Sequence, residues 1–221
     1  MANINIGTRQ CQKPKGWLGR LVLRMMNARH SKVTDWGLSH IAVAKNQMLL
    51  DVGCGGGRTV SKLAALASEG KVYGIDYSAE SVSFARKTNH EWIRLGRVEI
   101  QEAAVSRLPF PDSTFDTAIA VETHFWWPDL PAGMREILRV LKPGGTLVIV
   151  AEIYRNSKSK SSEMLEKYAS LSGMKYLTSD EHRELFDRAG YSDIQVTTAP
   201  EKGWICCTGR KPDMNGRSPK K

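Results

Sequence analysis

Short apolar runs alternate with amphipathic helical stretches through the middle of the chain, and this alternation restricts the fold more than any other feature. The runs predict β-strands at 48–52, 71–75, 97–100, 116–121 and 145–150, and the stretches between them predict helices at 57–68, 78–90 and 130–141. Strands that follow one another through a helix lie parallel in one sheet. The pattern therefore predicts an α/β fold with a doubly wound, mostly parallel sheet and helices on both of its faces.

The two ends of the chain have different patterns. Before the first strand, apolar residues at helical spacing predict an amphipathic helix at 17–27, and a second helix is expected at 35–44. After the fifth strand we expect a helix at 179–189 and two strands at 194–198 and 204–208. Since only a short turn joins these two strands, they should pair antiparallel at one edge of the sheet.

The net charge of +9 over 221 residues suggests a nucleic-acid or membrane partner, but its distribution restricts that interpretation. Residues 1–32 hold seven Lys or Arg and no acid, and residues 208–221 hold five basic residues and one acid. The body between them has 20 basic and 22 acidic residues, so its own charge is slightly negative. A nucleic-acid groove on the folded body is therefore not expected, and nucleic acid is not predicted as a partner.

A glycine-rich turn follows the first predicted strand, in the sequence Leu50-Asp-Val-Gly-Cys-Gly-Gly-Gly-Arg58. Glycines at such a turn let the backbone N–H groups of the loop and the following helix approach a ligand closely. The glycines stand at 53, 55 and 57, whereas a dinucleotide fingerprint would need its third glycine at the position of Arg58. Asp51 disfavours a pyrophosphate there and favours a ligand with a cationic amino group.

The second predicted strand ends at Asp76, about 20 residues after the glycine turn. An acid at this position is placed to accept hydrogen bonds from the two hydroxyls of a ribose, and Tyr77 would then lie against an adenine ring. The alternative is that Asp76 caps the following helix, although Ser78 suits that role better.

Together these elements resemble the class I S-adenosylmethionine-dependent methyltransferases, in the large group that includes the ubiquinone and menaquinone biosynthesis enzymes. The resemblance rests on Asp51-Val-Gly-Cys-Gly-Gly-Gly57, Asp76, Leu108-Pro-Phe-Pro-Asp-Ser-Thr-Phe-Asp116 and Arg135-Glu-Ile-Leu-Arg-Val-Leu-Lys-Pro-Gly-Gly145. It implies a Rossmann-like seven-stranded sheet of order 3-2-1-4-5-7-6, with an N-terminal helical lid at 1–45, a methyltransferase domain at 46–211 and a basic flexible tail at 212–221. S-adenosylmethionine is the cofactor it implies, and S-adenosylhomocysteine the product.

The resemblance also implies a role for particular residues. Asp51, Gly53, Gly55 and Gly57 would hold the methionine part of the cofactor, Asp76 the ribose and Tyr77 one face of the adenine. Val121 and Glu122 would lie under the methionine and the reactive methyl group. Where the family usually has an acid that reads the adenine amino group, this chain has Ala104, so backbone groups near Ala104 and Val105 are expected to take over that contact.

Two histidines are candidate general bases, because imidazole accepts a proton near neutral pH. His124 follows the fourth predicted strand and His30 follows the N-terminal helix. For His124 the alternative is a residue that fixes its loop, and the aromatic residues 125–127 after it suit either a pocket wall or packing against the next helix. No metal site is expected, because the four cysteines lack ligand spacing.

The function predicted on these grounds is methyl transfer from S-adenosylmethionine to an oxygen, nitrogen or carbon of a small-molecule acceptor. Two alternatives stay open: an RNA methyltransferase that uses the basic termini as tethers, and an inactive scaffold that only binds the cofactor. The helix at 17–27 is expected to shut water out of the site, and its basic, amphipathic character also suits peripheral contact with an anionic membrane. With no long apolar segment and with cysteines that read as free thiols, the chain is expected in the cytoplasm. The sequence predicts no particular oligomeric state.

Overall fold

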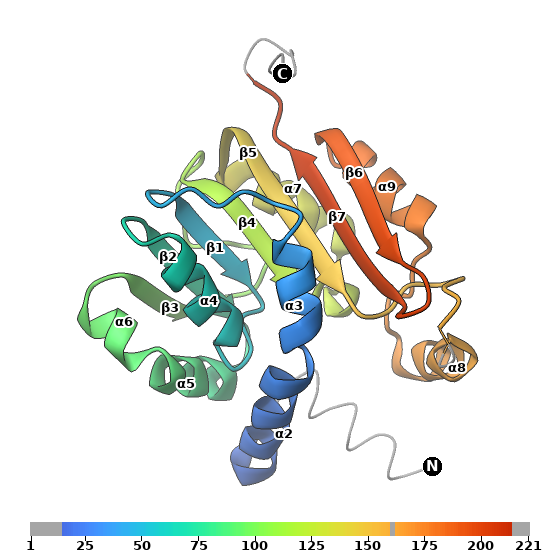
Figure 1. Ribbon diagram of the computed structural model, residues 1–221, viewed down its shortest axis with the longest axis horizontal. Helices are drawn as coiled ribbons and strands as arrows, with labels where there is room; N and C mark the ends of the chain where they lie inside the picture. The colour runs from blue at the N-terminus through green and yellow to red at the C-terminus, as the bar shows by residue number, and fades with distance from the viewer. Residues whose placement is uncertain (1–14, 160–161, 214–221) are drawn as a thin grey trace.

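The computed structural model describes residues 15–159 and 162–213 and has a seven-stranded sheet at its centre, in the order β3-β2-β1-β4-β5-β7-β6 (Figure 1). The strands are β1 (Met48–Val52), β2 (Lys71–Asp76), β3 (Val98–Glu102), β4 (Phe115–Val121), β5 (Leu141–Ala151), β6 (Ser192–Ala199) and β7 (Trp204–Arg210). β7 runs antiparallel to both of its neighbours, and the pairs from β3 to β5 are all parallel. The predicted fold class and strand order are confirmed.

Helices cover both faces of the sheet because its central strands are apolar on both sides. In β1 the neighbouring residues Leu49 and Leu50 are both fully buried and belong to two different core clusters, one on each face. One face packs against α3 (Ser31–Leu38), α4 (Arg58–Leu66), α5 (Ala79–Thr88) and α6 (His90–Arg94), and the other against α7 (Leu130–Val140) and α9 (Ser179–Arg188). This burial on both faces is typical of parallel sheets.

The carboxyl ends of the parallel strands meet at one edge of the sheet, and α2 (Gly16–Arg29) lies there (Figure 1). α2 buries Leu23, which is 1% exposed, and contacts α5 and α3. In open α/β sheets ligands bind at this edge, in the crevice where the strand order reverses. Here the order reverses between β1 and β4, so the fold places α2 over the expected site.

Several details differ from the sequence prediction. Helix α3 ends at Leu38 and not at residue 44, and the short α6 and the longer α8 (Ser162–Ser172) were not predicted. Strand β5 begins at Leu141, which pairs with Phe115 before the register shifts. None of the helices among the described residues is long and apolar enough to cross a lipid bilayer. Residues 1–14 of the predicted lid and residues 214–221 of the predicted tail lie outside the described residues.

Candidate cofactor and active site

The glycine turn wraps around the carboxyl end of β2. The backbone N–H groups of Gly53 and Cys54 both donate to the carbonyl of Ile75, at 2.8 Å each, which fixes the loop beside Asp76. Gly55 has a φ of +50°, a conformation that favours glycine, and a Cβ there would meet nothing within 4 Å. Gly53 and Gly55 line a cavity at this edge, as predicted for residues that approach a ligand.

Gly57 packs against α5, and its contact with the cofactor stays a prediction. It is missing from the described residues that line the cavity, and it caps the start of α4 with a φ of +79°. A Cβ at Gly57 would lie 2.5 Å from Nδ2 of Asn89 and 2.9 Å from Cα of Ala85. The glycine therefore permits close packing of the turn against α5, and the structure gives no ground for a direct cofactor contact.

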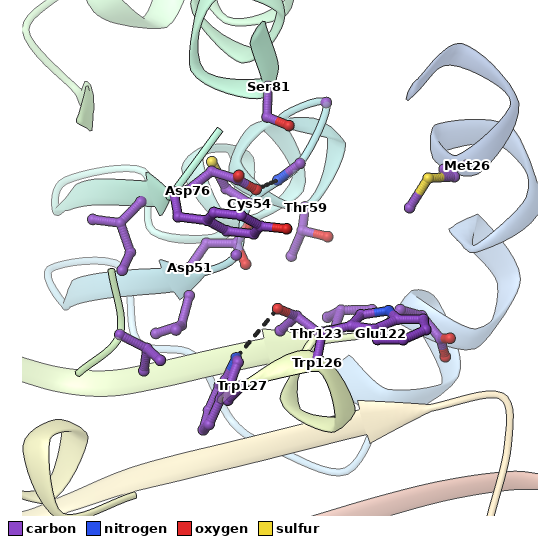
Figure 2. A pocket seen from close by; sticks show the side chains of 18 of the residues that line it. Met26, Asp51, Cys54, Thr59, Asp76, Ser81, Glu122, Thr123, Trp126 and Trp127 are labelled. Carbon is purple, nitrogen blue, oxygen red and sulfur yellow. Dashed lines mark hydrogen bonds between the residues drawn. The ribbon is translucent and has the colours of Figure 1, made fainter. Parts of the chain in front are cut away.

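Asp76 lies at the cavity with both carboxylate oxygens held by backbone donors. Gly55 N–H donates to Oδ2 (Figure 2), and Ser78 N–H donates to Oδ1, both at 2.9 Å. Ser78, not Asp76, is the side-chain cap of α5, as the sequence favoured. A carboxylate has about four acceptor positions, so each oxygen keeps capacity for a ligand hydroxyl. Burial raises the pKa of Asp76, and the hydrogen bonds from Ser78 and Gly55 offset part of that rise.

Asp51 is the clearest sign that this half of the cavity takes a polar ligand. Its side chain is 1% exposed, and Oδ2 has no hydrogen-bond partner in the described part of the chain. Burial, and to a lesser extent the charge of Asp76, raises the pKa of Asp51 to about 8. A buried acceptor without a donor is costly, so a ligand that brings an ammonium group would relieve it.

The other residues predicted to bind the cofactor also line this cavity: Tyr77, Ala104, Val105, Val121 and Glu122. Tyr77 is 43% exposed, and burial raises its pKa to about 12. Cys54 lines the cavity as well, but burial raises its pKa well above the usual range, so it packs as a small neutral side chain.

Helix α2 forms one wall of the cavity and rests against the glycine turn. Leu23, Met26, Asn27 and His30 line it, and Figure 2 shows Met26 facing the region of Asp76 and Thr59 across the opening. Asn27 Nδ2 donates to the carbonyl of Gly56 at 3.2 Å. A Cβ at Gly56 would lie 2.5 Å from Asn27, so this glycine lets the lid helix rest on the turn.

Three titratable side chains from three elements meet where α2 ends. His30 Nε2 lies 3.6 Å from Oε1 of Glu152, and Arg29 contacts the same oxygen at 2.7 Å. Glu122 follows β4 with a left-handed φ of +58°, and its Oε1 accepts the backbone N–H of Glu152. Such strain in a residue that is not glycine is found mainly at functional sites. One ligand atom from each of His30, Glu122 and Glu152 lies within 4.8 Å of the others.

The electrostatics of this triad favour proton exchange near neutral pH. Burial lowers the pKa of His30, but the hydrogen bond to Glu152 and the charge of Glu122 outweigh burial and raise it above the usual value. Burial raises the pKa of Glu122 to about 7 despite the nearby His30. For Glu152, burial acts to raise the pKa, but His30 and Arg29 lower it overall. The absence of a metal site stays a prediction, because this donor set also suits a small cation.

The structure places His124 in the core, and its catalytic role stays a prediction. It begins the short 3₁₀ turn His124–Trp126, is 1% exposed and is missing from the described lining of the cavity. Its Nε2 lies 3.0 Å from Nε2 of His182, whose Nδ1 lies 2.7 Å from the carbonyl of Thr178. Nδ1 of His182 therefore donates to that carbonyl, and Nε2 of His182 accepts from His124. The alternative interpretation, a histidine that fixes its loop, agrees with this arrangement.

The aromatic residues after His124 divide between the two predicted roles. Trp126 and Trp127 line the cavity, and Nε1 of Trp127 donates to Oγ1 of Thr123 at 3.3 Å (Figure 2). Trp127 also packs on α7, because a Cβ at Gly133 would lie 2.8 Å from its ring. Phe125 is 6% exposed and lies in the core.

Glu152 and Arg29 were missed by the sequence interpretation. Val121 and Val150 are partners in the parallel pair of β4 and β5, so the residues just after them reach the same edge. Glu152 could therefore have been found as an acid directly after the fifth strand, in the same way as Glu122 was found after the fourth strand.

Comparison with known proteins agrees with this geometry. Residues 50–149 match the family described as "Methyltransferase domain". The chain is 32% identical over 161 residues to the O-methyltransferase cnsE of Penicillium expansum, covering 73% of this chain and 58% of that protein. It is 30% identical over 159 residues to an O-methyltransferase of Pyrenophora dematioidea, covering 72% and 59%. The chain thus spans about three fifths of the length of these two relatives.

A solved structure with the same fold is that of a SAM-dependent methyltransferase from Aquifex aeolicus. It has a TM-score of 0.68 at 21% identity and covers 86% of this chain and 97% of that one. Fold, motif order and sequence similarity agree, and residues 50–149 are a methyltransferase domain of the class I S-adenosylmethionine-dependent kind.

Proposed function

We propose that this chain transfers the methyl group of S-adenosylmethionine to a hydroxyl oxygen of a small acceptor molecule, with His30 as the general base. The observation that carries the proposal is one cavity lined both by a half suited to the cofactor and by His30 and Glu122, two members of the titratable triad. The two fungal relatives are named O-methyltransferases, which favours oxygen among the possible accepting atoms.

The residues present fit the cofactor. Asp51 offers a buried acceptor without a donor, which suits the ammonium of the methionine part. Asp76 keeps acceptor capacity for the ribose hydroxyls, and Tyr77 and Ala104 line the same region for the adenine. When bound, the cofactor supplies a methyl group that is already activated on a sulfonium. The protein then needs only to align the acceptor and to accept its proton.

His30 would accept the proton of the acceptor hydroxyl. The contact between His30 Nε2 and Glu152 favours the tautomer with its proton on Nε2, which leaves Nδ1 as the basic nitrogen. Glu152 is then a positioning residue, since it orients the ring and stabilises the imidazolium that forms. Arg29 contacts the same oxygen of Glu152 and helps to hold the carboxylate in place. Leu23, Met26 and Trp126 give this half of the cavity an apolar wall, which favours an acceptor with an apolar body.

The test is transfer of labelled methyl from S-adenosylmethionine to small phenols and alcohols, followed by mass identification of the product. We expect a methyl ether, and we expect the reaction to disappear in the His30→Gln variant while cofactor binding remains. A protein that binds the cofactor but methylates no acceptor in such a panel, or in a metabolite extract, would support the inactive scaffold. Label recovered in RNA would support the alternative RNA methyltransferase.

The pH profile separates a base from a merely structural histidine. Since His30 acts only when neutral, turnover should rise with pH through its raised pKa. Glu152→Gln removes the partner that raises that pKa, so the rising limb should move to lower pH as turnover falls. A rising limb that stays in place in Glu152→Gln contradicts the role of Glu152 as partner of the base.

We further propose a small molecule as the only substrate besides the cofactor, with no nucleic acid, and the cytoplasm as the compartment. The described cysteines Cys54, Cys206 and Cys207 are buried free thiols, which suits a reducing compartment.

A further inference from the structure

The outer side of α2 presents apolar side chains that the described part of the chain leaves partly exposed. Leu18, Leu21 and Met25 are 36%, 46% and 63% exposed. Their spacing of three and seven residues places them on one stripe of the helix. We call these three residues the α2 stripe. The opposite side of the same helix is buried or lines the cavity, through Leu23, Met26 and Asn27.

Basic residues surround the α2 stripe and acids are absent from it. Arg24 is exposed within the same two turns, and Lys32 is exposed just beyond the end of α2. Arg20 and Arg29 are 56% and 71% exposed, although each also pairs with a glutamate of the domain. From residue 15 to residue 32 the sequence contains five Lys or Arg and no Asp or Glu. The surface is therefore apolar and carries positive charge, through Arg24 and Lys32 in particular.

We propose that α2 docks the protein on the surface of an anionic lipid bilayer, with the α2 stripe in the interfacial region and the arginines at the headgroups. Helices of this composition lie in the plane of the interface and bind by apolar burial together with attraction to anionic lipids. The charge complementarity is the reason to choose this occupant over a neutral apolar partner.

A second copy of the chain fits the α2 stripe less well. Three partly exposed side chains on one helix fall far short of the roughly 800 Å² that each partner buries in a stable protein complex. Two copies meeting through this helix would also bring their arginines together. Docking on a bilayer requires neither a large buried area nor the close approach of two sets of arginines, because the contributions of a few inserted side chains and several cations add together.

The position of α2 gives the docking a consequence for the cavity. One side of the helix would face lipid while the other side, through Leu23 and Met26, forms the cavity wall. An apolar molecule dissolved in the bilayer could then enter the cavity by passing around this one helix. Docking itself needs neither the cofactor nor methyl transfer, so it can be tested independently of the proposed reaction.

Vesicle sedimentation tests the proposal with the full chain. We expect binding to vesicles of phosphatidylcholine with phosphatidylserine, much weaker binding to phosphatidylcholine alone, and a loss of binding at high salt. Leu21→Glu with Met25→Glu should weaken binding to the anionic vesicles at least tenfold. Arg24→Gln with Lys32→Gln should weaken it about thirtyfold, since each of the two cations near an anionic surface contributes about 1 kcal/mol.

Leu66→Glu with Leu95→Glu is the matched control. These side chains are 46% and 57% exposed, close to the values of Leu21 and Met25. They precede β2 and β3, at the amino edge of the sheet, opposite α2. The control should bind vesicles as the unchanged protein does, and all variants should keep their affinity for S-adenosylhomocysteine, since none of the substituted residues is among the described lining of the cavity.

Three results would overturn the proposal. The first is that the unchanged protein stays in the supernatant with anionic vesicles. The second is that the variant of the α2 stripe sediments like the unchanged protein. The third is a concentration-dependent dimer that the same variant abolishes while no vesicle binding occurs, which would assign this face to a second copy.

Discussion

Replacing Asp76 by alanine tests the cofactor half of the site most directly. The carboxylate is 8% exposed at the end of β2 and lines the cavity. Its two oxygens already accept the N–H groups of Gly55 and Ser78, so the orientation of the side chain is fixed before any ligand arrives. A fixed acceptor binds without the entropy cost of ordering a free side chain.

The expected loss of affinity follows from the remaining acceptor positions. Each oxygen has room for one ribose hydroxyl, and a hydrogen bond to a charged group contributes about 1.5–3 kcal/mol. Two such bonds that share one carboxylate are not fully additive, so Asp76→Ala should cost about 3 kcal/mol, or roughly a hundredfold in Kd. The same change leaves the N–H groups of Gly55 and Ser78 without their acceptor, which destabilises the fold by about 1–3 kcal/mol for each.

The two effects are separated by measuring them independently. Calorimetry with S-adenosylhomocysteine gives the affinity, and urea unfolding shows that the variant is folded at the temperature of the titration. Asp76→Asn keeps one acceptor oxygen without the charge, so its affinity should lie between those of the unchanged protein and Asp76→Ala. Glu102→Ala is the control, because Glu102 is the register partner of Asp76 on β3 but lies outside the described lining of the cavity. A folded Asp76→Ala protein with unchanged affinity would refute the assignment.

Other predictions concern the adenine, helix α3 and the triad. Ala104→Asp restores the acid that the family usually has and should tighten cofactor binding, which calorimetry measures; no gain would mean that the adenine is read elsewhere. Gly37→Ala places a Cβ 2.4 Å from Cγ2 of Val150 and should destabilise the protein by about 1–3 kcal/mol in urea unfolding, with partial recovery when Val150→Ala is added. If His30 and its glutamates act by proton transfer alone, a chelator should leave turnover unchanged, whereas loss of turnover restored by a divalent cation would indicate a metal site.

Much of the fold could be predicted because its signals are local. Strand β1 has the predicted ends, 48 and 52, since an apolar run and a glycine turn bound it directly. Helix α8 was missed for the opposite reason, because Met164 and Leu171 on it are exposed and, among its described side chains, only Ala169 is buried, so its pattern hardly differs from that of a polar loop. The extension of β5 back to Leu141 depends on a partner in β4, which local sequence does not reveal.

The candidate site was predictable to the extent that the fold fixes where strands end. Asp51, Asp76 and Glu122 all follow or end strands at the same edge, and the structure brings them to one cavity. Gly57 and His124 occupy similar places along the chain, but their surroundings depend on distant residues. Asn89 packs on Gly57, and His182, 58 residues away, holds His124. A position near a strand end is therefore a weaker indication that a residue belongs to the site than the contacts that its side chain makes in the fold.

The pair of His124 and His182 predicts a specific dependence of folding stability on pH. Burial lowers the pKa of both, and for His124 the neighbouring His182 adds to the effect. The unfolded chain therefore binds more protons than the folded one once the pH falls below about 6.5. The stability that the neutral pair contributes is complete above that pH and is lost as the pH falls, by up to about 2.7 kcal/mol per pH unit for the two histidines together.

Urea unfolding at about pH 7.5 and about pH 5.5 measures this loss as a difference between proteins, so that contributions of other groups cancel. His124→Phe with His182→Leu removes both partners at once and leaves no unpaired ring behind. The double variant should lose less stability than the unchanged protein between the two pH values. His90→Gln, at an exposed histidine, should lose as much as the unchanged protein. Equal losses in the double variant and the unchanged protein would mean that the buried pair already accepts a proton in the folded state, and the neutral, mutually hydrogen-bonded pair would have to be abandoned.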